Sequence, residues 1–175
     1  KTGRGDGGRL GAKRMNEAGE NDVAGSAQNN LQLSWETGST DFEQAKAEVK
    51  GEQGIWGKEF SAEMDQAYAA ADAVISRSGA MAVSELCLVK KPVVFVPYPF
   101  AAEDHQTANA KELADKDAAI LVKDSNASAE LIPVLLKLIN DNTRQIELKN
   151  NIVKYAVKNA DEIIALQILN YLKRA

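Results

Sequence analysis

Cysteine, histidine and proline are scarce in this sequence, which has one, one and four of them among 175 residues. A single cysteine, Cys87, excludes an internal disulfide, and its apolar helical surroundings predict a buried core residue in a reducing compartment. No apolar run approaches the roughly 20 residues that a membrane-spanning helix needs. The first residues also lack the apolar segment of a signal peptide. We therefore expect a soluble protein without a transmembrane segment.

A concentrated positive charge is absent as well. The 21 lysines and arginines are dispersed among 25 acidic residues, and the formal net charge is −4. Nucleic-acid binding requires a clustered basic surface, so we expect no nucleic-acid partner. With 45% apolar residues in a chain of 175, the protein can bury one hydrophobic core but not two. The composition therefore predicts one compact domain.

Residues 1–30 differ in composition from the rest of the chain. Residues 1–6 contain no apolar run, and residues 17–30 contain one valine and a few alanines as their only apolar side chains. Such segments bury too little apolar surface to fold, so we expect a weakly ordered, glycine-rich lead before a folded domain at residues 31–175. The glycine-rich turn at residues 7–13 is a weak phosphate-loop candidate, because such loops normally follow a strand.

From residue 31 onward, strand patterns alternate with helix patterns. This alternation is typical of an α/β fold with a Rossmann-like, doubly wound parallel sheet. The strand at 92–96 is apolar throughout, which indicates burial on both faces, and Ser61 is the expected N-cap of the second helix. The predicted strands are 31–35, 54–56, 73–76, 92–96 and 118–122, and the predicted helices are 41–49, 63–70, 80–89, 104–114, 129–140, 143–157 and 161–172.

The last three predicted helices should cover the sheet with their apolar faces. The final helix carries a broad apolar stripe, which is typical of a helix that packs on a core. We therefore expect it to be buried there and assign it no chemistry. Its apolar residues are Ile163, Ile164, Leu166, Ile168, Leu169, Tyr171 and Leu172.

The turn at residues 75–85 has the features of an anion-binding site. Open parallel sheets bind ligands beyond the carboxyl ends of their strands, where N–H groups at helix N-termini are free. Here a strand ends, Gly79 permits a close backbone approach, and a helix of small residues begins without an acidic side chain in its first turn. Glu85 follows about one and a half turns later, and its carboxylate can accept hydrogen bonds from a ribose diol. Spacing alone also fits an ordinary surface glutamate.

A second turn, at residues 100–110, lies between an apolar strand and a helix. It is rich in side chains that hydrogen-bond to sugar hydroxyls, and it includes His105 and Gln106 at the expected helix start. A lone histidine is commonly structural, but this one lies beside the proposed pocket. We therefore keep both residues as candidate ligand contacts.

Three stretches together resemble a known glycosyltransferase family: residues 68–72, residues 75–85, and residues 95–97 with 104–110. Over about residues 7–175, the chain is similar to the C-terminal half of certain GT-B enzymes. These enzymes transfer N-acetylglucosamine (GlcNAc) from UDP-GlcNAc to undecaprenyl-pyrophosphoryl-MurNAc-pentapeptide, the step of peptidoglycan synthesis that produces lipid II. The resemblance implies a Rossmann-like domain that binds the UDP-sugar donor.

The resemblance also implies roles at the first turn. The backbone of Ala80, Met81 and Ala82 would face the donor diphosphate, and Glu85 would bind the ribose hydroxyls.

Four further residues match donor-binding positions of the family. His105 and Gln106 match the paired side chains that contact the GlcNAc hydroxyls, although some members have glutamine in place of the histidine. Phe60 and Ser61 match the loop whose backbone reads uracil.

The N-terminal region departs from the family pattern. Gly8 and Arg9 lie where the glycine loop contacts phosphate, but the family has serine in place of the arginine. An arginine can still pair with a diphosphate. Residues 1–6 are polar where the family has an apolar strand, and we expect them not to take that strand's place in the core.

In the family, an inverting two-domain enzyme closes over donor and acceptor, and neither a metal nor a cofactor is implied. The acceptor-binding half has no counterpart among these residues. The resemblance therefore implies a donor half whose helix amides stabilise the leaving diphosphate, and which binds UDP-GlcNAc but scarcely turns over alone. The lipid-linked acceptor would come through the missing half, at the cytoplasmic face of the plasma membrane.

Two other functions fit the same residues. One is a stand-alone donor-binding subunit that needs a membrane partner subunit, similar to the two-subunit eukaryotic enzyme of dolichol-linked GlcNAc transfer. The other is a non-catalytic nucleotide-binding module, since a fold alone does not fix a function.

Overall fold

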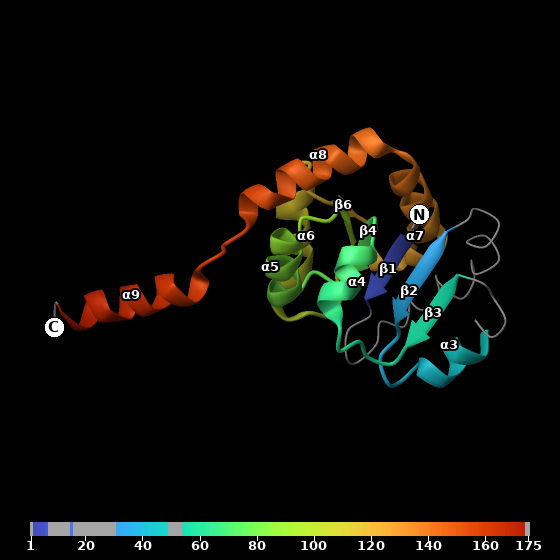
Figure 1. Ribbon diagram of the computed structural model, residues 1–175, viewed down its shortest axis with the longest axis horizontal. Helices are drawn as coiled ribbons and strands as arrows, with labels where there is room; N and C mark the ends of the chain where they lie inside the picture. The colour runs from blue at the N-terminus through green and yellow to red at the C-terminus, as the bar shows by residue number, and fades with distance from the viewer. Residues whose placement is uncertain (1, 7–14, 16–30, 49–53, 174–175) are drawn as a thin grey trace.

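The computed structural model describes residues 2–6, 15, 31–48 and 54–173, which form a six-stranded sheet, helices packed against it and a last helix that extends away from it (Figure 1). All the strands run parallel in the order β3-β2-β1-β4-β5-β6. The strand β1 thus lies inside the sheet, with β2 and β3 on one side of it and β4, β5 and β6 on the other. This order confirms the predicted doubly wound, Rossmann-like fold. The strands are β1 (Thr2–Asp6), β2 (Gln32–Glu36), β3 (Ile55–Lys58), β4 (Ala73–Ser76), β5 (Val93–Phe95) and β6 (Ile120–Leu121).

The helices cover sequence ranges close to those predicted. The helix predicted at 143–157 ends at Ile152, and a 3-10 turn follows it at Val153–Tyr155. No helix in the described part of the chain is long and apolar enough to cross a membrane. The helices are α3 (Phe42–Glu48), α4 (Met64–Ala70), α5 (Ala80–Val89), α6 (His105–Ala114), α7 (Ala127–Asn140), α8 (Asn142–Ile152) and α9 (Ala160–Leu172), with 3-10 turns η1 (Ala102–Asp104), η2 (Asp124–Asn126) and η3 (Val153–Tyr155).

The predicted cap of α4 is wrong. Glu63, not Ser61, is the N-cap residue, and its side chain makes no capping hydrogen bond. The backbone N–H of Ser61 donates instead to Oε2 of Glu36 at 3.2 Å. Ser61 therefore belongs to the loop that follows β3 and is fixed by β2 rather than by the helix.

Side chains of the central strands alternate between two cores, as the two-residue period of a strand requires. Ala73 and Ile75 of β4 pack in the core lined by α7, whereas Val74 packs with residues of α5 and α6. All three residues of β5 are fully buried, which confirms the prediction of burial on both faces. Cys87 is buried in the core of α5 and α6 as predicted, and this burial raises the pKa of its thiol.

Residues 2–6 form the central strand β1, so the expectation that they form no strand is wrong. β1 pairs with β2 on one side and with β4 on the other, and the backbone N–H of Asp72 donates to the carbonyl of Thr2 at 2.8 Å. Backbone pairing on both edges needs no apolar side chain, so tertiary context overrides strand propensity here. Of the rest of the expected lead, residues 1, 7–14 and 16–30 lie outside the described residues.

The side chain of Arg4 is buried in the middle of the sheet because an acidic partner lies beside it. Nη2 of Arg4 lies 3.2 Å from Oε2 of Glu36, and the two side chains are only 2% and 4% exposed. Nη1 donates to Oγ of Ser34 at 3.3 Å, and the guanidinium lies 5.7 Å from the centroid of the Tyr68 ring. A buried charge is tolerated when it is paired and hydrogen-bonded. We call Arg4, Ser34, Glu36 and Tyr68 the Arg4 cluster.

The opposite face of β1 accommodates α7 closely because glycine lies there. A Cβ atom on Gly3 would lie 3.1 Å from Cδ2 of Leu135 and 3.5 Å from Cδ1 of Leu31. The first of these contacts is short enough that the Leu135 side chain would have to move by a few tenths of an ångström, whereas the second is an ordinary van der Waals contact. The residues of β1 therefore fit both faces of the sheet. Arg4 pairs with an acidic side chain on one face, and Gly3 leaves room for α7 on the other.

The last helix does not cover the sheet, and the prediction that its apolar stripe packs in the core is wrong. Every residue from 157 to 173 is exposed, and Figure 1 shows α9 extending away from the rest of the molecule. Ile163 and Leu166, for example, are 47% and 59% exposed. Apolar periodicity identifies a helix face that favours burial, but it does not identify the surface that buries it.

Glu36→Gln should destabilise the protein strongly, because it removes the charge that compensates the buried Arg4. We expect the free energy of unfolding, measured by chemical denaturation, to fall by about 3–5 kcal/mol. The double variant Arg4→Leu/Glu36→Gln has no buried charge and keeps an oxygen that can accept from the N–H of Ser61. It should recover most of the loss. A double variant as unstable as the single one would contradict this role of the pair.

Removal of residues 160–175 should change the free energy of unfolding by no more than about 0.5 kcal/mol, because the described residues of α9 are all exposed. Chemical denaturation of the shortened chain tests this. Removal from residue 142 onward is the contrasting variant, since it also deletes the buried Leu148 and Ile152, and it should unfold the protein. A large loss from the shorter truncation would mean that α9 packs on the domain.

Candidate functional site

The start of α5 presents free backbone donors at the carboxyl end of β4. Gly79 is the N-cap residue, with extended backbone angles, and no acidic side chain lies in the first helical turn. The first intrahelical bond runs from the N–H of Val83 to the carbonyl of Gly79 at 2.9 Å. The N–H groups of Ala80, Met81 and Ala82 precede that bond, so they have no partner within the helix. The helix dipole makes this end favourable for an anion.

The two turns predicted to bind ligand lie against each other. Oγ of Ser78, which is fully buried, donates to the backbone carbonyl of Gln106 at 2.8 Å. Nδ2 of Asn109 donates to the carbonyl of Ser78 at 3.0 Å. These two bonds fix the start of α6 beside the start of α5.

Gln106 lies directly beside the glycine at the start of α5. Its Oε1 accepts from the N–H of Tyr98 at 3.0 Å, which orients the amide. Its Nε2 would lie 3.9 Å from a Cβ atom built on Gly79. The amide nitrogen of Gln106 is therefore held next to the open helix end as a hydrogen-bond donor.

His105 is exposed at the first position of α6. Its Nδ1 lies 2.7 Å from the carbonyl oxygen of Ala102, and because a carbonyl can only accept, Nδ1 must carry the proton. Nε2 of the neutral ring is then an acceptor. The preceding residues, Glu103 and Asp104, have φ angles of 52° and 51°, which non-glycine residues rarely adopt.

Glu85 is exposed on α5, one to two turns beyond the open helix end. Its Oε2 accepts a hydrogen bond from the hydroxyl of Tyr68 at 3.4 Å. Tyr68 belongs to α4 and is buried. The carboxylate is thus solvent-accessible, and one of its two oxygens accepts from a tyrosine of the neighbouring helix.

Phe60 and Ser61, the predicted base-reading residues, follow β3. Phe60 is 62% exposed, whereas Ser61 is buried. Because the N–H of Ser61 donates to Glu36, that donor is already occupied. Gly8 and Arg9, the other predicted phosphate contacts, lie outside the described residues.

An ion pair between Arg77 and Asp124 links neighbouring segments at the carboxyl edge of the sheet. Nη1 of Arg77 lies 2.7 Å from Oδ1 of Asp124 and donates to the carbonyls of Val96 and Pro97 at 2.9 and 3.2 Å. This arrangement joins the end of β4 to the end of β5 and to η2. The ion pair was not predicted from the sequence, because its two residues lie 47 positions apart.

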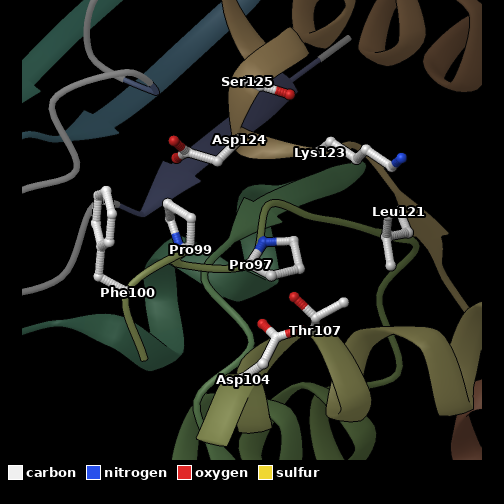
Figure 2. A pocket seen from close by; sticks show the side chains of 9 residues that line it. All are labelled: Pro97, Pro99, Phe100, Asp104, Thr107, Leu121, Lys123, Asp124 and Ser125. Atoms are coloured by element: carbon white, nitrogen blue, oxygen red, sulfur yellow. The ribbon is translucent and has the colours of Figure 1, made fainter. Parts of the chain in front are cut away.

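A hollow of about 490 Å³ adjoins the start of α6. Figure 2 shows Asp104, the last residue of η1, and Thr107 of α6 at its edge, and Lys123, Asp124 and Ser125 across from them. None of the predicted donor-site residues that the structure describes lines it. Its lining residues are Pro97, Pro99, Phe100, Asp104, Thr107, Leu121, Lys123, Asp124 and Ser125.

The described residues contain no group of three or more His, Cys, Asp or Glu side chains that could hold a metal ion. The site consists of backbone amides, a carboxylate, an amide side chain and an imidazole. Three of the side chains that build it had no predicted role: Tyr68, Ser78 and Asn109. Asn109 lies three residues after Gln106 on the same helix, and this spacing could have identified it.

Comparison with known families supports the predicted relationship. Residues 7–164 match the family described as the Glycosyltransferase family 28 C-terminal domain. The chain belongs to this family. The match confirms the resemblance inferred from the sequence motifs, and it includes both turns of the site.

Relatives of known name agree with this assignment. The chain is 40% identical over 170 residues to a UDP-N-acetylglucosamine–N-acetylmuramyl-(pentapeptide) pyrophosphoryl-undecaprenol N-acetylglucosamine transferase of Parabacteroides distasonis, covering 96% of this chain and 46% of the relative. It is 44% identical over 165 residues to the protein of that name from Flavobacterium psychrophilum, covering 91% and 45%. The chain therefore spans about half the length of these relatives.

A solved structure has the same fold. The crystal structure of Acinetobacter baumannii MurG superposes with a TM-score of 0.82 at 30% identity, over 97% of this chain and 49% of that one. The fold class predicted from the sequence, the C-terminal half of a GT-B glycosyltransferase, is confirmed.

Asn109→Ala should loosen the contact between the two turns, because it removes the donor to the carbonyl of Ser78. We expect a loss of about 1–2 kcal/mol in the free energy of unfolding, measured by chemical denaturation. Asn140→Ala is the matched control, since Nδ2 of Asn140 donates only within its own helix, to the carbonyl of Leu136 at 2.9 Å. Equal effects of the two substitutions would show that the bond to Ser78 adds nothing.

Proposed function

We propose that this chain is the UDP-GlcNAc-binding half of an inverting transferase that transfers GlcNAc to undecaprenyl-pyrophosphoryl-MurNAc-pentapeptide. The proposal depends above all on one observation. In a family 28 chain, the open N-terminus of α5 is fixed beside the start of α6, with Glu85 and Gln106 nearby. The names of the relatives supply the donor and the acceptor.

The diphosphate of the donor would lie at the start of α5. The N–H groups of Ala80, Met81 and Ala82 point to that end, and the helix dipole adds a favourable field. When UDP leaves, negative charge grows on its terminal phosphate. Amides that are already oriented stabilise this charge without reorganising, which is the contribution of this half to catalysis.

Glu85 and Ser61 would bind the nucleoside. The carboxylate of Glu85 accepts from the two ribose hydroxyls, a role that suits a group with only acceptor oxygens. The carbonyl of Ser61 accepts from the imide N–H of uracil, while its own N–H remains with Glu36. The exposed ring of Phe60 is next to this position in the chain.

The GlcNAc group would lie near the start of α6. Nε2 of Gln106 donates to a sugar hydroxyl, and Nε2 of His105 accepts from one. The acceptor and the groups that deprotonate its hydroxyl would come from the part of the relatives that this chain does not span. We infer that the complete enzyme acts at the cytoplasmic face of the plasma membrane, where its lipid-linked acceptor is anchored.

Glu85→Ala should weaken the binding of UDP and UDP-GlcNAc by at least about tenfold, because even one hydrogen bond to a charged group contributes about 1.5–3 kcal/mol and Glu85 would accept two. Calorimetric titration measures the two affinities, and UDP-GalNAc is titrated to test the preference for the sugar. Glu112→Ala is the matched control, since Glu112 is an exposed glutamate in the last turn of α6. It should bind like the unaltered chain.

Folding of each variant can be checked at Cys87. Its burial raises the pKa of the thiol, so a thiol reagent should label it slowly while the domain is folded. If the folded, unaltered chain binds none of the three nucleotides, or if Glu85→Ala binds them normally, the assigned site is wrong.

A further inference from the structure

We propose that Tyr68 is a positioning residue for the donor ribose, and that the Arg4 cluster holds it in place. The proposal rests on the proposed function, because it concerns the carboxylate assigned there to the ribose. Tyr68 itself touches no donor atom in this scheme. It acts through Glu85.

Glu85 needs such a partner because it is exposed. A free glutamate side chain samples several rotamers, and fixing it on a ligand costs conformational entropy. The hydroxyl of Tyr68 donates to Oε2 of Glu85 at 3.4 Å, which favours one placement of the carboxylate before the ligand arrives. The remaining acceptor positions of the carboxylate stay open for the ribose hydroxyls.

Tyr68 can restrain Glu85 because it is itself restrained. Its side chain is 4% exposed and packs with Val74 and Leu86 in the core of α5 and α6. One face of its ring is near the guanidinium of Arg4, 5.7 Å from the centroid, and Arg4 is paired with Glu36. The tyrosine hydroxyl is therefore a donor at a fixed place.

The same cluster also holds the other nucleoside-reading group. Oε2 of Glu36 accepts from Nη2 of Arg4 at 3.2 Å and from the backbone N–H of Ser61 at 3.2 Å. One arm of contacts therefore leads from Arg4 through Glu36 to Ser61, and another leads through Tyr68 to Glu85. A single buried cation in β1 thus sets the separation between the base-reading loop and the ribose-reading carboxylate.

Tyr68→Phe tests the proposal, because it keeps the ring and its packing and removes only the hydroxyl. We expect the calorimetric affinity for UDP to fall about three- to tenfold. The affinity for 2′,3′-dideoxyuridine 5′-diphosphate, which lacks both ribose hydroxyls, should change less than twofold. In a Glu85→Ala background, Tyr68→Phe should have no further effect on UDP binding. Tyr171→Phe, at an exposed position on α9, is the control.

The outcomes separate the two proposals. If Glu85→Ala weakens UDP binding but Tyr68→Phe does not, the positioning role is overturned and the proposed function stands. A loss that is equal for UDP and its dideoxy analogue also overturns it, since that pattern reflects general destabilisation. If Glu85→Ala has no effect, the ribose role of Glu85 fails, and the positioning role fails with it. Slow labelling of Cys87 in Tyr68→Phe establishes that the variant is folded.

Discussion

The ion pair between Arg4 and Glu36 is the interaction on which the rest of the structure depends. It lies between β1 and β2 with almost no exposure, and it lets a strand of glycine and polar residues occupy the centre of a parallel sheet. Breaking such a pair leaves an uncompensated buried charge, which costs more than the pair gains. The contacts that lead to Ser61 and to Glu85 both begin at this pair. In the proposed site, stability and ligand geometry are therefore coupled through the same two residues.

Much of the fold follows from local sequence. β4, α5, β5 and α6 are all close to their predicted ranges, because their apolar periods are clear and their turns contain glycine or proline. β1 could not be predicted in this way, since its stability comes from strands 30 and 70 residues away. The position of α9 was missed for the opposite reason: its pattern is clear, but a pattern does not identify the surface it packs on.

The candidate site could likewise be predicted only in part from local sequence. Ala80 to Ala82, Glu85 and Gln106 were predicted from a helix start, a spacing and a family resemblance, and the structure brings the two turns that contain them together. Their roles toward a ligand remain proposals. The residues that arrange them, such as Tyr68, Asn109 and Arg77, act across 17 to 47 residues of sequence. Contacts of that length are a property of the folded chain. A local pattern can place Asn109 on the same helix face as Gln106, but it cannot identify the partner, Ser78.

The central place of β1 has a consequence for folding during synthesis. Its neighbour β4 is made about 70 residues later, an interval of roughly 4–14 seconds at 5–20 residues per second. Throughout that interval the strand has no complete sheet to join. An apolar strand that waits in this way is an aggregation hazard. A strand of threonine, glycine, arginine and aspartate can stay hydrated on the ribosome and enter the sheet when both of its neighbours have formed.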